Sequence, residues 1–197
     1  MRVVRISKEI LWKEPKMNKD MHQFLARLER EKPWDVLRIK KEVSPEFEIP
    51  AILQQVESLR KEPAIIFEKV RNLNGDFSPF PVVINLFGSR GRLADALDST
   101  IQRLPFDYLE REREVPPVLI DKGKSRVKEV IQTGKAADLF AIPCITHHEM
   151  DLGPYISAGT CWIKDPETGW TNCAILRIYV AGKQRLLVNF NPARHTN

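Results

Sequence analysis

The segment GPYISAGTCWIKDPETGWTNCAILRIYVAGKQRLLVNFNPARH, from Gly153 to His195, carries the strongest local structural signals of the chain. Three runs in it are rich in β-branched and aromatic residues, and turn residues separate them. Pro192 ends the third run, because proline has no N–H to donate to a neighbouring strand. The pattern predicts a three-stranded meander with strands at Ile156–Lys164, Trp170–Val180 and Arg185–Phe190, and turns at Asp165–Gly169 and Ala181–Lys183.

Two residues of the second run are unusual for a strand. Successive side chains of a strand point to opposite faces, so the run has two sets of residues. A polar Asn172 begins one set, and a single Arg177 stands among apolar neighbours in the other. The predicted faces are Asn172, Ala174, Leu176 and Ile178 on one side, and Cys173, Ile175, Arg177 and Tyr179 on the other.

Length and composition place the chain among globular proteins. It has 197 residues, 43% of them hydrophobic and 29% charged, enough for one large or two small domains with a buried core. The formal net charge is +5, with lysine and arginine spread among the acidic residues. This distribution favours a mixed surface over a nucleic-acid footprint, and the positive charge suits an anionic ligand such as a phosphate or carboxylate.

The cysteines and the first residues indicate the cellular compartment of the protein. Cys144, Cys161 and Cys173 are odd in number and contain no C-x-x-C pair, so we expect neither a disulfide framework nor a thiolate zinc site. This usage is typical of a reducing cytoplasm. Met1–Lys16 lacks an apolar core of signal-peptide length, and no segment approaches the length of a membrane span.

The first half of the chain alternates helix and strand patterns. Pro33 stops the first helix, and Pro50 lies in the first turns of the second, where proline is tolerated. Val115-Pro116-Pro117 then follows a charge run, and residue usage shifts from helical to β-branched. We therefore predict an α+β chain with domains at 1–115 and 116–197. The expected helices are Lys19–Glu31, one opening at Ser44–Glu46 with Ile49, Ile52, Leu53, Val56 and Leu59 inward, and Thr100–Glu114; the strands are Asp35–Lys41, Ala64–Phe67 and Pro81–Leu86.

Two short motifs have both a functional and a structural interpretation. Gly88–Arg92, GSRGR, could hold a phosphate at a strand-to-helix turn, but it fits neither dinucleotide nor P-loop spacing. We favour a helix N-cap with solvated arginines. His147-His148-Glu149 suggests a metal cluster, yet adjacent histidines on extended chain point to opposite sides. We favour an exposed loop.

Three residues near the end of the chain are candidates for a site. The amide of Asn172 and the imidazole of His195 suit a divalent ion such as manganese, although a carboxylate ligand is usually present too. A capped turn and a surface histidine are the alternative interpretation. Arg177 is either an edge residue reaching solvent or a fixed charge whose rigid fork faces a substrate carboxylate in a pocket.

The order and spacing of several motifs resemble the UbiD family of reversible decarboxylases, which use prenylated flavin mononucleotide. The resemblance covers roughly 20–197 and is more specific from Asp138 onward. It also extends to Phe24–Leu28, Ile49–Leu53, Pro63–Phe67 and Gly88–Arg90 in the first half. The matching pieces of the second half are Leu139–Pro143, Gly153–Gly159, Asp165–Gly169, Trp170–Arg177 and Arg194-His195.

The resemblance implies a role for each matching site residue. Asn172 and His195 resemble two ligands of the divalent metal that clamps the cofactor phosphate. Arg177 resembles the catalytic arginine that orients the substrate carboxylate and joins the acid–base network. Ile175 resembles the apolar residue near the isoalloxazine. The implied cofactor-binding set is Thr171, Asn172, Cys173, Ala174, Ile175, Arg177, Arg194 and His195, with prenylated FMN and manganese or magnesium, and room for a potassium ion.

The resemblance also implies a fold and partners. The fold is a small α/β N-terminal domain followed by the first part of a flavin-reductase-like split β-barrel. Asn172 and Arg177 are five apart, so for both to reach one cofactor Asn172 must lie at the strand's end or beside a bulge. The implied substrate is a small carboxylic acid, and the assembly is a homo- or hetero-oligomer that binds neither nucleic acid nor membrane.

Members of the family extend beyond the residue that corresponds to His195. The metal's glutamate ligand and the catalytic glutamates lie in that later part, so we expect a second polypeptide to supply them and the isolated chain to be inactive. The alternatives are a truncated product, a non-catalytic cofactor-binding or scaffold subunit of a larger enzyme, and an interaction protein that has lost the site.

Overall fold

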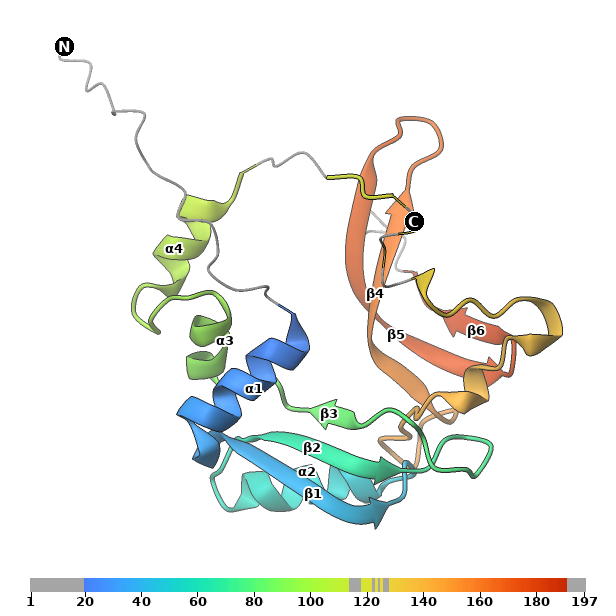
Figure 1. Cartoon of the computed structure of the whole chain (residues 1–197), viewed down its shortest axis with the longest axis horizontal. Coiled ribbons are helices and arrows are strands. Elements are labelled where there is room, and N and C mark those ends of the chain that lie inside the picture. Colours follow the sequence, from blue (N-terminus) through green and yellow to red (C-terminus); the bar gives the residue numbers. More distant parts are fainter. Residues whose placement is uncertain (1–19, 114–117, 122, 124, 126–127, 191–197) are drawn as a thin grey trace.

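The computed structural model describes residues 20–113, 118–121, 123, 125 and 128–190. It contains two three-stranded sheets with helices, so the predicted α+β class is confirmed. Figure 1 shows the first sheet at the bottom of the view, with α3 and α4 above one end and the β4–β5 hairpin rising from the other. The predicted domain boundary at 115 falls among residues outside this description.

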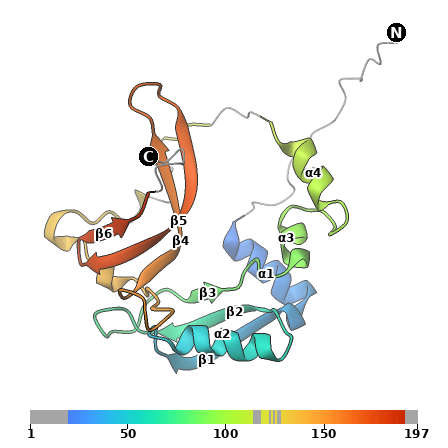
Figure 2. The ribbon, with the colours of Figure 1, turned by 180° about the vertical axis from the view of Figure 1, so that it is seen from behind.

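The first sheet is built on a buried central strand. β1 (Val36–Val43) and β2 (Ala64–Val70) are parallel, and β3 (Val82–Ile84) pairs with β2 in the antiparallel direction. The connection from β1 to β2 runs through α2 (Glu48–Ser58), and Figure 2 shows α2 in front of both strands, covering this face of the sheet. The core cluster consists of Val43, Ile49, Ile65, Phe67, Val70, Val82 and Ile145.

Local signals place the helices of the first half correctly, with small differences at their ends. α1 (Met21–Glu31) begins at Asp20, whose side chain accepts a hydrogen bond from the Gln23 N–H. The inner face predicted for α2 is confirmed at Ile49, Ile52, Leu53 and Val56. It is wrong at Leu59, which is 60% exposed because it follows the last helical residue.

The Gly88–Arg92 turn has a structural role, as expected, but one of its arginines is buried rather than solvated. Ser89 caps α3 (Arg90–Ala96) by accepting from the Arg92 N–H, which confirms the N-cap. The expectation of solvated arginines is wrong for Arg92, whose side chain is fully buried. Its guanidinium pairs with Asp35 (2.5 Å) and donates to the carbonyls of Leu86, Asn85 and Glu62. Arg92 therefore ties α3 to the loops before β1, β2 and α3. The charged helix predicted next is shorter than expected, as α4 (Leu104–Arg111).

A short segment of the second half joins the first sheet. The N–H of Phe47 donates to the carbonyl of Thr146, and the N–H of Thr146 donates to Pro45, each at 3.0 Å. Ile145 belongs to the core of the first sheet, and its carbonyl accepts from the N–H of Tyr155 at the start of β4. The start of the second sheet is therefore attached to the core of the first.

The second sheet is the predicted antiparallel meander of β4 (Tyr155–Lys164), β5 (Thr171–Gly182) and β6 (Arg185–Val188). The Asp165 carboxylate accepts from Glu167, Thr168 and the Thr168 hydroxyl, and Gly169 has a φ of 74°, so the first turn forms as expected. The second turn is later than predicted. Gly182 still pairs with Arg185 across a register shift, so the chain turns at 183–184.

Over the described part of the chain, no helix has both the length and the apolar character needed to cross a bilayer. Cys144, Cys161 and Cys173 are free.

Candidate active site

The β4–β5 hairpin has one face that is open to solvent. Burial alternates along β5: Ile178 and Val180 are buried, whereas Cys173, Ile175 and Arg177 are exposed. Cys173 pairs with Trp162 of β4, so these side chains share a face. Trp162 and Ile175 are each 73% exposed. We call Trp162, Cys173, Ile175 and Arg177 the open face.

Asn172 lies near the beginning of β5, as the prediction for a shared cofactor required. It is the second residue of the strand, and it pairs with Ile163. β5 is regular from Asn172 to Arg177, so the two side chains point to opposite faces. A register shift lies in β4, between Ile156 and Gly159, opposite Arg177. No contact between Asn172 and Arg177 is present among the described residues.

Arg177 is held from two sides. Its Nη2 donates to Oδ2 of Asp151 at 2.5 Å, and its Cζ lies 3.7 Å from the centroid of the Tyr155 ring. The ring contact has the geometry of a cation–π interaction. The Arg177 side chain is still 42% exposed. The guanidinium is therefore held in place by two contacts, and the predicted role in binding a substrate carboxylate stays a prediction.

Asp151 is the acid that pairs with Arg177, and the turn from His148 to Asp151 fixes its place. The N–H of His148 donates to Oδ2 of Asp151 (3.1 Å), and the N–H of Asp151 donates to the carbonyl of His148 (3.0 Å). The Asp151 side chain is only 10% exposed. The hydrogen bond from Arg177 lowers the pKa of Asp151 to about 2, so this carboxylate is ionised at neutral pH.

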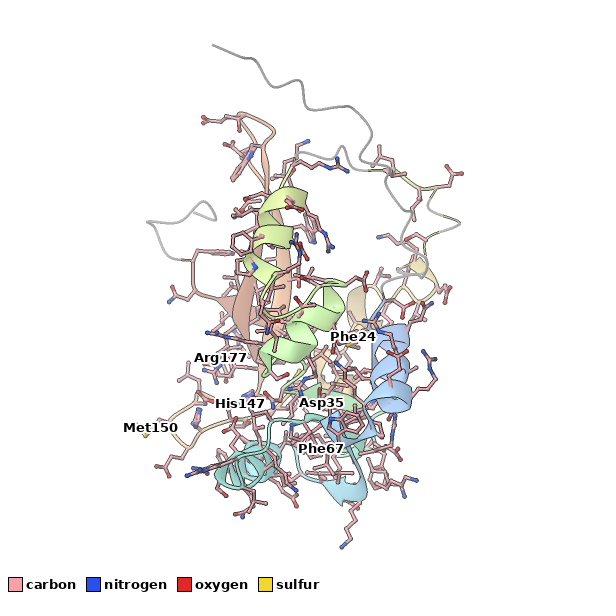
Figure 3. The ribbon with its side chains drawn as sticks, turned by 90° about the vertical axis from the view of Figure 1, so that its left-hand side faces the viewer. Phe24, Asp35, Phe67, His147, Met150 and Arg177 are labelled. Carbon is pink, nitrogen blue, oxygen red and sulfur yellow. The ribbon has the colours of Figure 1, made fainter. Side chains whose placement is uncertain are left out.

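His147 lies beside this ion pair. The expected exposed loop is confirmed for His148 and Glu149, but His147 is half-buried, and its Nδ1 is buried without a hydrogen-bond partner among the described residues. Burial lowers the pKa of His147, and the charge of Arg177 acts in the same direction. His147 is therefore neutral at pH 7. Figure 3 shows Arg177 and His147 at the same edge of the molecule.

The described residues include part of the set that was predicted to bind the metal and the cofactor. The side-chain amide of Asn172 makes no hydrogen bond to a described residue, and its role as a metal ligand stays a prediction. Where the structure is described, no three His, Cys, Asp or Glu side chains are grouped to hold a metal ion. Arg194 and His195 lie outside the described residues. Thr171, Cys173, Ala174 and Ile175 follow one another along β5 as expected.

Sequence reasoning missed Asp151, Tyr155 and His147 as neighbours of Arg177. None of them belongs to a periodic pattern, and Asp151 is 26 residues from Arg177. One local signal was present in Gly153, which has a φ of 146°. A Cβ on Gly153 would lie 3.1 Å from Cε2 of Tyr179, so glycine allows the loop that carries Asp151 to approach β5 closely.

Comparison with known proteins identifies relatives of both halves of the chain. Residues 25–112 match the 3-octaprenyl-4-hydroxybenzoate carboxy-lyase N-terminal domain, and residues 118–197 match the Rift-related domain of the same carboxy-lyase. The chain is 29% identical to the anhydromevalonate phosphate decarboxylase of Methanothermobacter thermautotrophicus, over 89% of this chain and 37% of that protein. It is 31% identical to an uncharacterised protein of the cooM 5′ region of Rhodospirillum rubrum, over 92% of this chain and 37% of that protein.

Solved structures agree with this relationship. The UbiD-class enzyme HmfF of Pelotomaculum thermopropionicum, in an evolved dimeric form with prFMN, superposes with a TM-score of 0.76 at 32% identity, over 89% of this chain and 39% of that one. Vanillic acid decarboxylase of Sedimentibacter hydroxybenzoicus (ShVdcCD), in open form with truncated ShVdcD, gives 0.73 at 28% identity over the same shares, 89% and 39%. The chain thus spans less than two fifths of the length of these relatives. By its two matching domains and its structural neighbours, the chain belongs to the UbiD family.

Proposed function

We propose that this chain forms the flavin-binding N-terminal part of a UbiD-type carboxy-lyase. The reaction is the reversible, non-oxidative decarboxylation of an aromatic or α,β-unsaturated carboxylic acid. The observation that carries the proposal is the placement of Arg177 at the edge of the open face, with Asp151 and Tyr155 holding its guanidinium and 42% of its side chain still exposed.

The residues of β5 suit the groups that the reaction requires. Ile175 offers an exposed apolar side chain next to Arg177, which fits the face of a flat ring. The amide of Asn172 would contribute one oxygen to a manganese or magnesium ion, and His195 would contribute an imidazole. Prenylated FMN, when bound, supplies the electron-accepting ring for the loss of carbon dioxide.

Arg177 would hold the carboxylate that leaves as carbon dioxide. In the reaction, the bond between the carboxylate carbon and the rest of the acid breaks, and a proton takes its place. A planar guanidinium binds a carboxylate through two parallel hydrogen bonds and so fixes its orientation. The glutamates that exchange the proton are proposed to come from a second polypeptide. ShVdcCD, which was solved with a further component, ShVdcD, supports the presence of a partner chain but not the origin of the glutamates. The division into 1–115 and 116–197 and the split β-barrel belong to the same proposal.

The test is an Arg177→Lys variant in a complex reconstituted with prenylated FMN, manganese and the partner. Lysine keeps the charge but loses the fork, so kcat/KM for the acid should fall about 10- to 100-fold, the value of one charged hydrogen bond. Arg185→Lys, at an exposed position on β6, is the matched control and should keep the wild-type rate. An unchanged kcat/KM for Arg177→Lys would refute the assignment of Arg177 to the substrate carboxylate.

A second candidate function is a non-catalytic cofactor-binding or scaffold subunit. The observation in its favour is the exposed apolar surface of Trp162 and Ile175, because large apolar patches often mark surfaces that bind other proteins. A native mass spectrum of the protein isolated from its own host separates the two. A complex with a second polypeptide, a prenylated flavin and a metal ion, active on an acid, supports the carboxy-lyase. The same complex without turnover of any acid supports the scaffold.

A further inference from the structure

Two contacts of different geometry hold the guanidinium of Arg177. The carboxylate of Asp151 contacts an N–H from the edge (2.5 Å to Nη2), whereas the ring of Tyr155 contacts the flat face (3.7 Å from Cζ). An edge contact limits rotation within the guanidinium plane, and a face contact limits its tilt. Together they determine the orientation of a side chain that is otherwise flexible and 42% exposed.

Both contacting groups are themselves held in place. Asp151 is 10% exposed and is bound by the N–H of His148 at 3.1 Å. The Tyr155 N–H donates to the carbonyl of Ile145, in the core of the first sheet, and its ring lies 5.3 Å from that of Tyr179. Asp151 and Tyr155 therefore fix the orientation of Arg177 relative to the fold through two separate connections.

The rest of the guanidinium is available. Arginine has five N–H groups, and among the described residues Asp151 is the hydrogen-bond partner of just one of them. The remaining N–H groups include a pair that can bind a carboxylate in the bidentate manner. The neighbouring His147 is neutral, so it does not compete with Arg177 for the charge of Asp151.

We propose that Asp151 is a positioning residue: it orients Arg177, against the Tyr155 ring, so that the free edge of the guanidinium faces the substrate carboxylate. The inference rests on the proposed function, because it assigns the carboxylate to Arg177. Asp151 itself does not touch the substrate. Its charge also offsets that of Arg177, which keeps the carboxylate from binding too tightly before the bond to carbon breaks.

Two measurements test the proposal, and the first needs neither cofactor nor substrate. In ¹⁵N NMR spectra of this chain, the guanidinium signals of Arg177, assigned by their loss in Arg177→Lys, should show slow rotation in the wild type. They should average in Asp151→Asn and stay slow in Glu149→Gln, which changes the same charge at an exposed position of the same loop. An Arg177 signal that is unaffected by Asp151→Asn overturns the positioning role, whether or not the enzyme turns over.

The second measurement uses the reconstituted holoenzyme, with cinnamate and benzoate as probe acids. Asp151→Asn should lower kcat about 10- to 100-fold, since misplacing a group that orients the substrate has this effect. KM should stay the same or fall, because an uncompensated positive charge remains. A merely structural role would not separate kcat from KM in this direction. Glu149→Gln should match the wild type, and an unchanged kcat in Asp151→Asn overturns the inference.

A second pair of variants guards against misfolding of Asp151→Asn. Tyr155→Leu removes the face contact and should mobilise Arg177 in the same way, whereas Tyr155→Phe keeps the ring and should resemble the wild type. Equal behaviour of the two Tyr155 variants contradicts the inference. The two proposals also fail separately: a normal kcat/KM in Arg177→Lys refutes the proposed function, whereas a loss of kcat/KM in Arg177→Lys with a normal kcat in Asp151→Asn refutes only the positioning role.

Discussion

Replacing Arg92 with methionine should destabilise the first half of the chain by about 4 kcal/mol. Methionine keeps an apolar stem but removes the guanidinium from a fully buried position. Breaking a buried ion pair costs about 3–5 kcal/mol. Asp35 is 23% exposed and can recover some hydration, which reduces this cost. The carbonyls of Leu86, Asn85 and Glu62 lose a charged donor, which offsets this reduction and keeps the total cost at about 4 kcal/mol, the middle of that range.

The assay is urea unfolding followed by circular dichroism at 222 nm. At a slope of about 2 kcal/mol/M, the midpoint should fall by about 2 M. Arg90→Met, at the exposed first residue of α3, is the control and should change the free energy of unfolding by less than about 0.5 kcal/mol. A loss below about 1 kcal/mol for Arg92→Met would refute the view that Arg92 ties these loops together.

Three further outcomes follow from the structure. The carboxylate of Asp151 has a pKa of about 2 because of its ion-pair partner, below the unfolded value of about 3.9. The ion pair should therefore stabilise the fold fully above pH 4, and this stabilisation should disappear between pH 4 and 2. The free energies of unfolding of the wild type and Asp151→Asn, measured as the pH is lowered, should converge in that range. Gly159→Ala should lower the melting temperature, because the new Cβ would lie 2.5 Å from Cδ1 of Ile178, whereas an equal melting temperature would contradict this packing. Thiol reagents at pH 8 should label exposed Cys173 well before Cys144, whose burial raises its pKa to about 11; equal labelling rates would contradict the burial of Cys144.

Most of the strands and helices could be predicted because their signals are local. The runs on either side of Asp165–Gly169 form β4 and β5 within two residues of the expected bounds, since turn chemistry and β-branched residues act on neighbouring positions. The later turn was misplaced because pairing of Gly182 with Arg185 depends on register, which one strand alone does not specify.

The candidate site was also predictable only where its sequence signals are local. Arg177 and Asn172 stood out in the sequence because a charge and an amide are unusual in an apolar strand, and alternation along β5 correctly separated their faces. The roles of Asn172 and His195 in metal binding stay predictions, as do those of the other cofactor-binding residues. The partners of Arg177 could not be found in this way, because Asp151 and Tyr155 come from a loop and a strand start without periodic signals.

By itself, the sequence determined the α+β class, the meander of Tyr155–Val188, the N-cap of α3 and the membership of a family that its motifs resemble. Only the tertiary structure decided that Arg92 is buried with Asp35, 57 residues away, and that Arg177 is held by Asp151. The physical reason is that backbone conformation depends on adjacent residues, whereas the environment of a charge depends on which distant groups the packed chain brings beside it.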